Sequence, residues 1–294
     1  MKIYVSVFIS LLLAACAGEI SGVEEVEKDS AMVDVDSLDD VEIPEIDSLI
    51  IEKELLDTLA FSKPVEKNLV SPHGVQIEIL SRDPNGVSLK KGDVVRIKYQ
   101  GKLPDGKIFD SSDMIGMPLP YYIGVNMSVK GWDDALPLLQ SGDKVRMKVP
   151  SSMAYGKKGY GKLIPPNTDL LFEMEILNIV QPEISESGLK FYKTVEKGGA
   201  LIKEGNTVTL HFYGWLEKTG KLFDASYRSG NPHEFILGNG RSLPCWDEAL
   251  KKMRLGEKAI IVSPSALAYG EKGIPELVPP NSTLIYSLEV VGVK

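Results

Sequence analysis

The sequence predicts an α+β fold present twice, as two tandem domains that each consist of an antiparallel sheet with one short helix packed on one side. Three observations support this prediction. The chain has 294 residues, which is enough for roughly two domains. A set of short motifs occurs twice in the same order, and several segments between the motifs alternate polar with apolar residues. A content of 43% apolar and 25% charged residues is that of a globular protein and allows two modest cores.

The repeat consists of four motifs whose two copies lie 114 residues apart, as Gly106 and Gly220 illustrate. A period above about 100 residues indicates duplicated globular domains, because solenoid repeats are much shorter. The motifs are GKIFD at 106–110 and GKLFD at 220–224, GWDDAL at 131–136 and CWDEAL at 245–250, AYG at 154–156 and 268–270, and LIPPN at 163–167 and LVPPN at 277–281.

The strands are predicted from alternation. Residues 94–99 and 144–149 alternate polar with apolar side chains, as half-buried antiparallel strands do. Residues 170–180 and 283–293 close the two repeats with similar patterns. Turns are expected at Gly142-Asp143 and at Gly256-Glu257.

One short helix is expected after the tryptophan of each repeat. In the first repeat Trp132, Ala135, Leu136 and Leu139 share one face of a helix. Pro137 is expected to end or kink this helix, because proline cannot donate a backbone hydrogen bond.

The N-terminus is predicted to be a bacterial lipoprotein signal peptide over residues 1–16. Lys2 precedes an apolar run at 3–13, which is too short to span a bilayer of ~30 Å hydrocarbon and is typical of an export signal. The run ends in LAAC at 13–16, which resembles the lipoprotein cleavage box and makes Cys16 the expected lipidation site. An ordinary secretory signal with a chance cysteine is the alternative. Ala17 after the cysteine favours the outer membrane, facing the periplasm.

Residues 17–68 are predicted to be an acidic flexible tether, with a possible short helix at 48–61. The stretch 17–62 holds 15 Asp and Glu residues against Lys28 and Lys53, and such a composition cannot bury enough surface to fold. The tether therefore accounts for the net charge of −8, and the rest of the chain is mildly basic. The absence of a dense basic face argues against a dedicated nucleic-acid binder.

The ordered motifs resemble those of the FKBP-type peptidyl-prolyl isomerases, over about 75–180 and again over about 188–294. No single motif is specific, but four in order, twice, are a strong signal. The resemblance implies two FKBP-like domains, predicted here at 69–182 and 183–294, each a twisted antiparallel sheet wrapped around one short helix. It also implies a shallow apolar cup that holds a proline ring and accelerates rotation about the X–Pro bond. Some members of the family dimerise through an N-terminal helix, but the oligomeric state is not predicted.

In the first repeat the resemblance assigns Trp132 to the floor of the cup. The walls would be Tyr99, Phe109 and Phe172. Tyr155 would donate a hydrogen bond to a substrate carbonyl, Val129 would offer its backbone N–H, and Asp110 would orient polar neighbours. The further matched positions are Ile164, expected with the catalytic set, and Tyr160 and Leu163, expected to contact substrate, while Leu119 stands where the family usually has an aromatic wall.

In the second repeat the match to the family is less complete. Phe212 replaces the wall tyrosine, His233 occupies another wall position, and Pro244-Cys245 precedes the tryptophan where the family usually has glycine. These differences leave open whether the second cup is active. The residues expected to contact substrate there are Phe212, Phe223, Asp224, Leu243, Trp246, Tyr269, Leu277, Val278 and Tyr286.

The implied chemistry needs no nucleophile, cofactor or metal. An apolar cup disfavours the planar, charge-separated amide relative to the twisted one, which is differential binding of the transition state. The three histidines, His73, His211 and His233, show no metal-ligand spacing, and Cys245 is expected to be a buried structural thiol. The expected partners are proline-containing segments of exported proteins and, through the lipid anchor, a membrane. The alternatives left open are a binding module with little turnover and a structural envelope lipoprotein.

Overall fold

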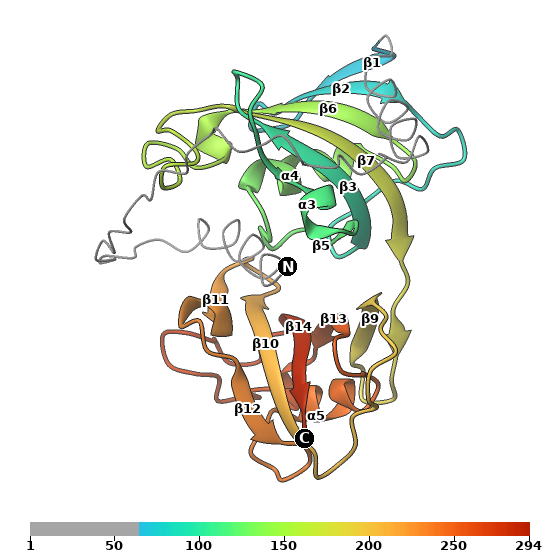
Figure 1. Ribbon diagram of the computed structural model, residues 1–294, viewed down its shortest axis with the longest axis vertical. Coiled ribbons are helices and arrows are strands. Elements are labelled where there is room, and N and C mark those ends of the chain that lie inside the picture. The colour runs from blue at the N-terminus through green and yellow to red at the C-terminus, as the bar shows by residue number, and fades with distance from the viewer. Residues whose placement is uncertain (1–64) are drawn as a thin grey trace, which may run out of the picture.

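The computed structural model describes residues 65–294, which form two domains joined end to end (Figure 1). The predicted signal peptide, Cys16, the possible helix at 48–61 and nearly all of the predicted tether lie outside the described residues. Within 65–294 no helix is both long and apolar enough to cross a membrane.

The first domain is a seven-stranded, fully antiparallel sheet in the order β1-β2-β6-β7-β3-β4, with β5 also paired to β3. Strand β1 pairs Lys67 with Ile79 of β2, so the domain begins two residues before the boundary predicted at 69. Its elements are β1 (Lys67–Val70), β2 (Gln76–Ser81), β3 (Val94–Lys102), β4 (Ile108–Ser111), α3 (Ser112–Ile115), β5 (Leu119–Tyr122), α4 (Lys130–Ala135), the 3-10 turn η1 (Leu136–Leu138), β6 (Lys144–Val149), the 3-10 turn η2 (Ser151–Met153) and β7 (Leu170–Val180).

The second domain repeats this topology in the order β11-β10-β14-β13-β9-β8, with β12 paired to β10. The duplicated antiparallel fold predicted from the motifs is thus confirmed. Its elements are β8 (Glu183–Ile184), β9 (Lys190–Val195), β10 (Thr207–Leu216), β11 (Leu222–Ala225), the 3-10 turn η3 (Ser226–Arg228), β12 (His233–Ile236), α5 (Pro244–Leu250), β13 (Lys258–Ser263), the 3-10 turn η4 (Ser265–Leu267) and β14 (Leu284–Val293).

The expected helix forms, but it begins at Lys130, so Trp132 lies within it and does not precede it. Helix α4 ends at Ala135 and tightens into η1, which contains Pro137. The first domain also has α3, a single helical turn that the sequence analysis did not predict. It forms because the Ser111 side chain accepts a hydrogen bond from the Met114 N–H at 3.2 Å and Gly116 ends the turn in the left-handed conformation, at φ 76°.

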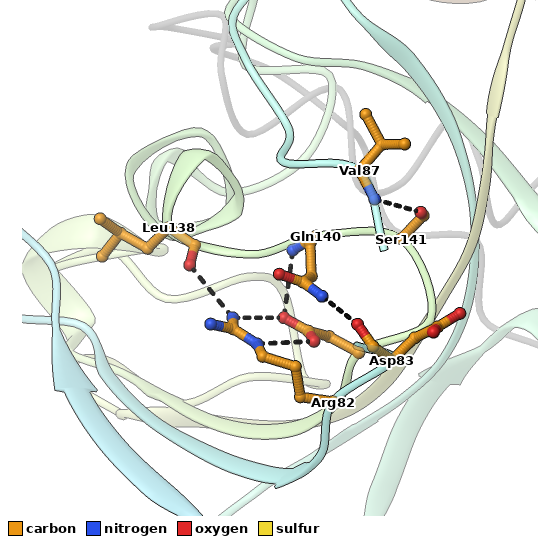
Figure 2. A network of polar contacts seen from close by, with 7 residues as sticks. Arg82, Asp83, Val87, Leu138, Gln140 and Ser141 are labelled. Atoms are coloured by element: carbon orange, nitrogen blue, oxygen red, sulfur yellow. Dashed lines mark hydrogen bonds and ion pairs between the residues drawn. The ribbon is translucent and has the colours of Figure 1, made fainter. Parts of the chain in front are cut away.

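The expected turn at Gly142-Asp143 belongs to a buried polar network (Figure 2). Asp143 is fully buried and takes two hydrogen bonds from Arg82, Nε to Oδ1 at 3.0 Å and Nη2 to Oδ2 at 2.7 Å. The backbone N–H of Gln140 adds a third bond at 3.1 Å, and the Gln140 side chain donates to the Asp83 carbonyl. A bidentate guanidinium compensates the desolvated carboxylate, so this network ties the chain after β2 to the turn before β6.

Candidate functional site

The first cup is a set of aromatic rings packed around Trp132, which lies on α4 and is fully buried. The ring centroids of Tyr99, Tyr121 and Phe172 lie 5.1, 5.4 and 5.3 Å from that of Trp132. Two of the three contacts are edge-on, with interplanar angles of 80° and 84°, the arrangement that aromatic quadrupoles favour. Strands β3, β5 and β7 therefore meet the helix at one tryptophan.

Tyr121 is a member of this cup that the sequence analysis missed. It is fully buried, and its hydroxyl donates to Asp133 Oδ1 at 2.9 Å. A signal was present, because Tyr121 follows Leu119 by two residues in a strand and must share its face of the sheet. Tyr121 thus supplies the aromatic ring that the family usually has at the position of Leu119.

Phe109 completes the cup from β4, and a glycine makes room for it. The rings of Phe109 and Phe172 lie 5.8 Å apart at 81°. A Cβ at Gly101 would come within 2.7 Å of Phe109 Cζ and 3.0 Å of Phe172 Cε1, distances that side chains do not tolerate. Gly101 is directly paired with Phe172 in the β3–β7 ladder, so only glycine there lets both walls close.

Asp110 is buried beside the cup and accepts a hydrogen bond from the Tyr99 hydroxyl at 2.7 Å. Burial raises the pKa of Asp110 to about 6, and the bond from Tyr99 opposes this rise. Burial and the neighbouring carboxylate both raise the pKa of Tyr99. The N–H of the next residue, Ser111, also lowers the pKa of Asp110. Ser112, which sequence reasoning missed, fixes the Tyr99 backbone by accepting from its N–H at 3.1 Å.

Val129 lies at the N-cap of α4 with an extended backbone, φ −63° and ψ 144°. Its carbonyl accepts from the Trp132 N–H at 3.0 Å, while its own N–H makes no hydrogen bond within the part of the chain that the structure describes. Asp133 shapes the preceding loop, residues 124–129, by accepting from the N–H groups of Gly124 and Asn126 at 2.9 and 2.5 Å. Burial raises the pKa of Asp133, against the effect of these hydrogen bonds. The loop therefore ends on a backbone donor that no group of residues 65–294 satisfies, beside Trp132.

The rim of the first cup is the loop that follows η2. Tyr160 and Ile164 exchange two backbone hydrogen bonds, at 2.7 and 3.0 Å, and the rings of Tyr155 and Tyr160 lie 5.4 Å apart. Ile164 is buried, whereas Tyr155, Tyr160 and Leu163 are partly exposed and pack against the same core. The structure therefore brings every predicted first-repeat residue to one place.

The second cup is built in the same way around Trp246 of α5. Its ring lies 4.8 Å from Phe212, 5.4 Å from Tyr286 and 6.0 Å from Phe235, which sequence reasoning missed. His233 is exposed and meets Trp246 edge-on at 5.8 Å. The predicted residues that join this cluster are Phe212, Phe223, Leu243, Trp246, Tyr269, Val278 and Tyr286. Leu277 does not join it and is 45% exposed.

The polar part of the cup differs between the two domains. Phe212 stands where the first cup has Tyr99, so no hydroxyl is available for the second aspartate. Asp224 is accordingly exposed, and its Oδ1 accepts from the N–H of the next residue, Ala225, at 2.8 Å. Its charge still contributes to raising the pKa of Tyr269, for which burial is the larger cause. The buried Tyr–Asp pair is therefore a property of the first cup alone.

Cys245 is explained by a matched change across the core. In the first domain a Cβ at Gly131 would lie 2.5 Å from Val149 Cγ1, so glycine is required beside valine. The corresponding residues of the second domain are Cys245 and Ser263, both fully buried and in contact. The smaller serine makes room for the thiol. Burial raises the pKa of Cys245 to about 12, as expected for a structural thiol.

Across residues 65–294 no group of three or more histidine, cysteine or acidic side chains is arranged to hold a metal ion. The predicted site residues gather in the two cups, whose chemistry is that of aromatic rings, backbone donors and, in the first cup, one buried carboxyl.

Comparison with known proteins identifies the family to which the two domains belong. Residues 86–177 and 198–291 both match the FKBP-type peptidyl-prolyl cis-trans isomerase family. Human peptidyl-prolyl cis-trans isomerase FKBP10 is 32% identical over 221 residues, 74% of this chain but only 37% of that protein. FK506-binding protein 1 of Debaryomyces hansenii is 42% identical over 109 residues, 37% of this chain and 97% of that protein.

Among solved structures, FkpA from Escherichia coli is similar at 38% identity over 38% of this chain and 51% of that one, with a TM-score of 0.36. The chain spans little more than a third of the length of the first relatives it matches. Two matched segments together cover more than half of the chain, in the two domains that carry the cups. The chain belongs to the FKBP-type peptidyl-prolyl cis-trans isomerase family.

Proposed function

We propose that the first domain catalyses cis–trans isomerisation of X–Pro bonds in polypeptides. The observation that carries the proposal is the complete first cup, in which three aromatic rings surround Trp132 and a buried Tyr99–Asp110 pair borders them. A substrate would contact the apolar floor at Trp132 and could accept a hydrogen bond from the N–H of Val129.

The chemistry follows from the barrier to amide rotation. The barrier of about 18–20 kcal/mol reflects the resonance that is lost in the twisted state. A planar amide is charge-separated and a twisted one is less so, hence a cup lined by Trp132, Tyr99 and Phe172 stabilises the twisted state relative to the planar one. Each ~1.4 kcal/mol of such preference is tenfold in rate.

Two polar groups hold the substrate in place. The Val129 N–H donates to no group among the described residues, and we assign it the role of donating to a substrate carbonyl. Tyr155 at the rim is assigned a second donor role. Asp110 acts through Tyr99, whose ring it holds against Trp132.

The test is the rate of cis-to-trans isomerisation of a short X–Pro peptide with the full chain. Asp110→Ala and Tyr155→Phe are each expected to lower kcat/KM by about tenfold or more, a loss of ~1.4 kcal/mol of transition-state binding. Their free energies of unfolding, measured in parallel, report folding separately. Unchanged kcat/KM in both folded variants would show that the assigned residues are not those of the site.

The second domain is proposed to bind proline-containing segments with less turnover. The observation that favours this is the missing Tyr–Asp pair, since Phe212 has no hydroxyl and Asp224 is exposed. A Trp246→Leu change in the full chain should weaken binding of a proline-rich peptide while lowering the isomerisation rate little. If Trp246→Leu in a chain that remains folded instead halves the rate, the second domain contributes to turnover and its proposed role as mainly a binding site is wrong.

We further propose that the protein is exported and lipid-anchored through Cys16, in the envelope of a bacterial cell, where it assists folding of exported proteins. The support is the sequence of residues 1–16 and the acidic stretch behind it. Incorporation of labelled palmitate in the producing bacterium tests this. Labelling that is lost in Cys16→Ser supports the anchor, and labelling that is absent from the wild-type chain refutes it.

A further inference from the structure

The outer face of the second sheet, turned away from α5, is apolar and covered. Tyr213, Trp215 and Ile260 on this face are 5%, 0% and 1% exposed. They belong to a core cluster that is separate from the one around Trp246. The members contributed by the first domain are Val94, Tyr122 and Val125, with Met127 and Val180 packed at the edge.

The corresponding face of the first sheet is charged and open to solvent. Lys102 corresponds to Trp215 of the second repeat and forms an ion pair with Glu173 at 2.7 Å. Arg146 corresponds to Ile260 and forms an ion pair with Glu78 at 3.0 Å. One repeat thus uses this face as surface and the other buries it. Because residues of both domains share one buried cluster, the contact between the domains is a packed interface. Burial of apolar area there is favourable by about 25 cal/mol per Å².

The first domain reaches this interface with the 124–129 loop of its own cup. Val125 is fully buried. A Cβ at Gly220, in the turn between β10 and β11, would lie 3.0 Å from Val125 Cα and 3.2 Å from the carbonyl oxygen of Gly124. The Tyr122 hydroxyl, just before the loop, lies 3.3 Å from Glu217 Oε1. The backbones of the loop and of the second domain are therefore in direct contact.

The loop is thus held from two sides. Asp133 binds its N–H groups from within the first domain, and the Gly220 turn and the apolar face contact it from the second. The loop ends at Val129, whose N–H donates to no group among residues 65–294. We infer that the second domain is a positioning platform for the first cup, with Gly220 and Val125 as positioning residues that fix where the Val129 donor lies. The expected effect on KM rests on the proposed function of the first cup, whereas the expected effect on the loop's hydrogen exchange does not.

A matched pair of glycine variants tests it in the full chain. Gly220 and Gly106 occupy the same turn of the two repeats, at φ +68° and +89°, but a Cβ at Gly106 meets nothing within 4 Å. Asparagine tolerates this left-handed conformation. Gly220→Asn therefore adds a contact against the loop, whereas Gly106→Asn changes the same turn without it. Val125→Ala, which truncates the loop side of the interface, is a second and milder variant.

Two readouts are expected to change in Gly220→Asn and Val125→Ala but not in Gly106→Asn. Amide hydrogen exchange in the 124–129 loop should be faster by about tenfold, as local opening becomes easier. KM for an X–Pro peptide should rise with kcat nearly unchanged, because a displaced Val129 donor weakens binding of ground state and transition state alike. A variant that merely unfolded in part would lower the maximal rate at unchanged KM.

The outcomes are distinct. Loop exchange that equals the wild type in both folded interface variants overturns the inference. Faster exchange with unchanged KM shows that the loop is held but does not position a substrate donor, which also overturns it. If the wild-type chain shows no isomerisation at all, the proposed function fails, while loop exchange still decides whether the second domain holds the loop.

Discussion

Replacing Tyr99 by phenylalanine gives the first cup the same ring as the second, and its effect should depend on pH. The change removes the hydroxyl that donates to buried Asp110 at 2.7 Å. A hydrogen bond to a charged group contributes about 1.5–3 kcal/mol, and one to a neutral group about 1 kcal/mol. The cost of Tyr99→Phe should therefore be about 2 kcal/mol with Asp110 ionised and about 1 kcal/mol with it protonated.

The pH range follows from the pKa of Asp110, which burial raises to about 6 in the folded protein, above the ordinary value of ~3.9. A raised carboxyl pKa means that the folded state holds an extra proton between about pH 4 and 6. The associated stability is present below pH 4 and is lost as the pH rises through 6. Without the Tyr99 hydroxyl the carboxylate is less stabilised and its pKa rises further. The difference between Tyr99→Phe and wild type should therefore widen from pH 5 to pH 8.

The assay is urea unfolding of the full chain at pH 5 and pH 8. The control is the same substitution in Asp110→Asn, which cannot ionise, and there Tyr99→Phe should cost a similar ~1 kcal/mol at both pH values. An equal cost of Tyr99→Phe at pH 5 and pH 8 in the wild-type background would refute the account of the buried pair. So would a pH-dependent cost that persists when Asp110 is asparagine.

Three further predictions concern buried groups of both domains. A carboxyl that titrates near pH 6, followed by NMR, should be present in the wild-type chain and absent in Asp110→Asn; a titration with no such group would contradict the burial of this side chain. Gly131→Cys should destabilise the first domain by about 1–3 kcal/mol, because the thiol would overpack against Val149. Adding Val149→Ser should recover part of this loss, as measured by chemical denaturation. Strictly additive costs of the two changes would argue against the compensating pair seen at Cys245 and Ser263. In a Cys16→Ser chain, Cys245 should react with a thiol reagent only after unfolding, because burial holds its pKa near 12; rapid labelling of the native protein would show that the thiol is accessible.

Much of the fold could be predicted because its signals are local. The alternating strand at 144–149 and the helix ended before Pro137 follow from patterns within a few residues, and the repeat follows from short motifs that occur twice. The prediction that Tyr99 and Phe172 lie against Trp132 came from the family resemblance. In the structure both ring centroids lie within 5.3 Å of that of Trp132.

The features that were missed depend on partners distant in sequence. The exposure of Asp224 is decided by the loss of a hydroxyl on a neighbouring strand, at Phe212. Cys245 fits because Ser263, eighteen positions later, is small. A signal for the interface between the domains was nevertheless present, since Trp215 and Ile260 replace Lys102 and Arg146 on the face that alternation assigns to solvent. This signal could be interpreted only in the structure, where residues of the first domain cover Trp215 and Ile260.

The proposed division of labour makes the first cup the catalyst and the second mainly a binding site. One comparison of isomerisation rates on an X–Pro peptide separates the two cups, between full-chain Tyr155→Phe and Tyr269→Phe, which alter the same rim position. We expect Tyr155→Phe to lower kcat/KM by about tenfold and Tyr269→Phe to leave most of it. A loss of equal size in both variants, or a greater loss in Tyr269→Phe, would show that the second cup is a catalyst as well.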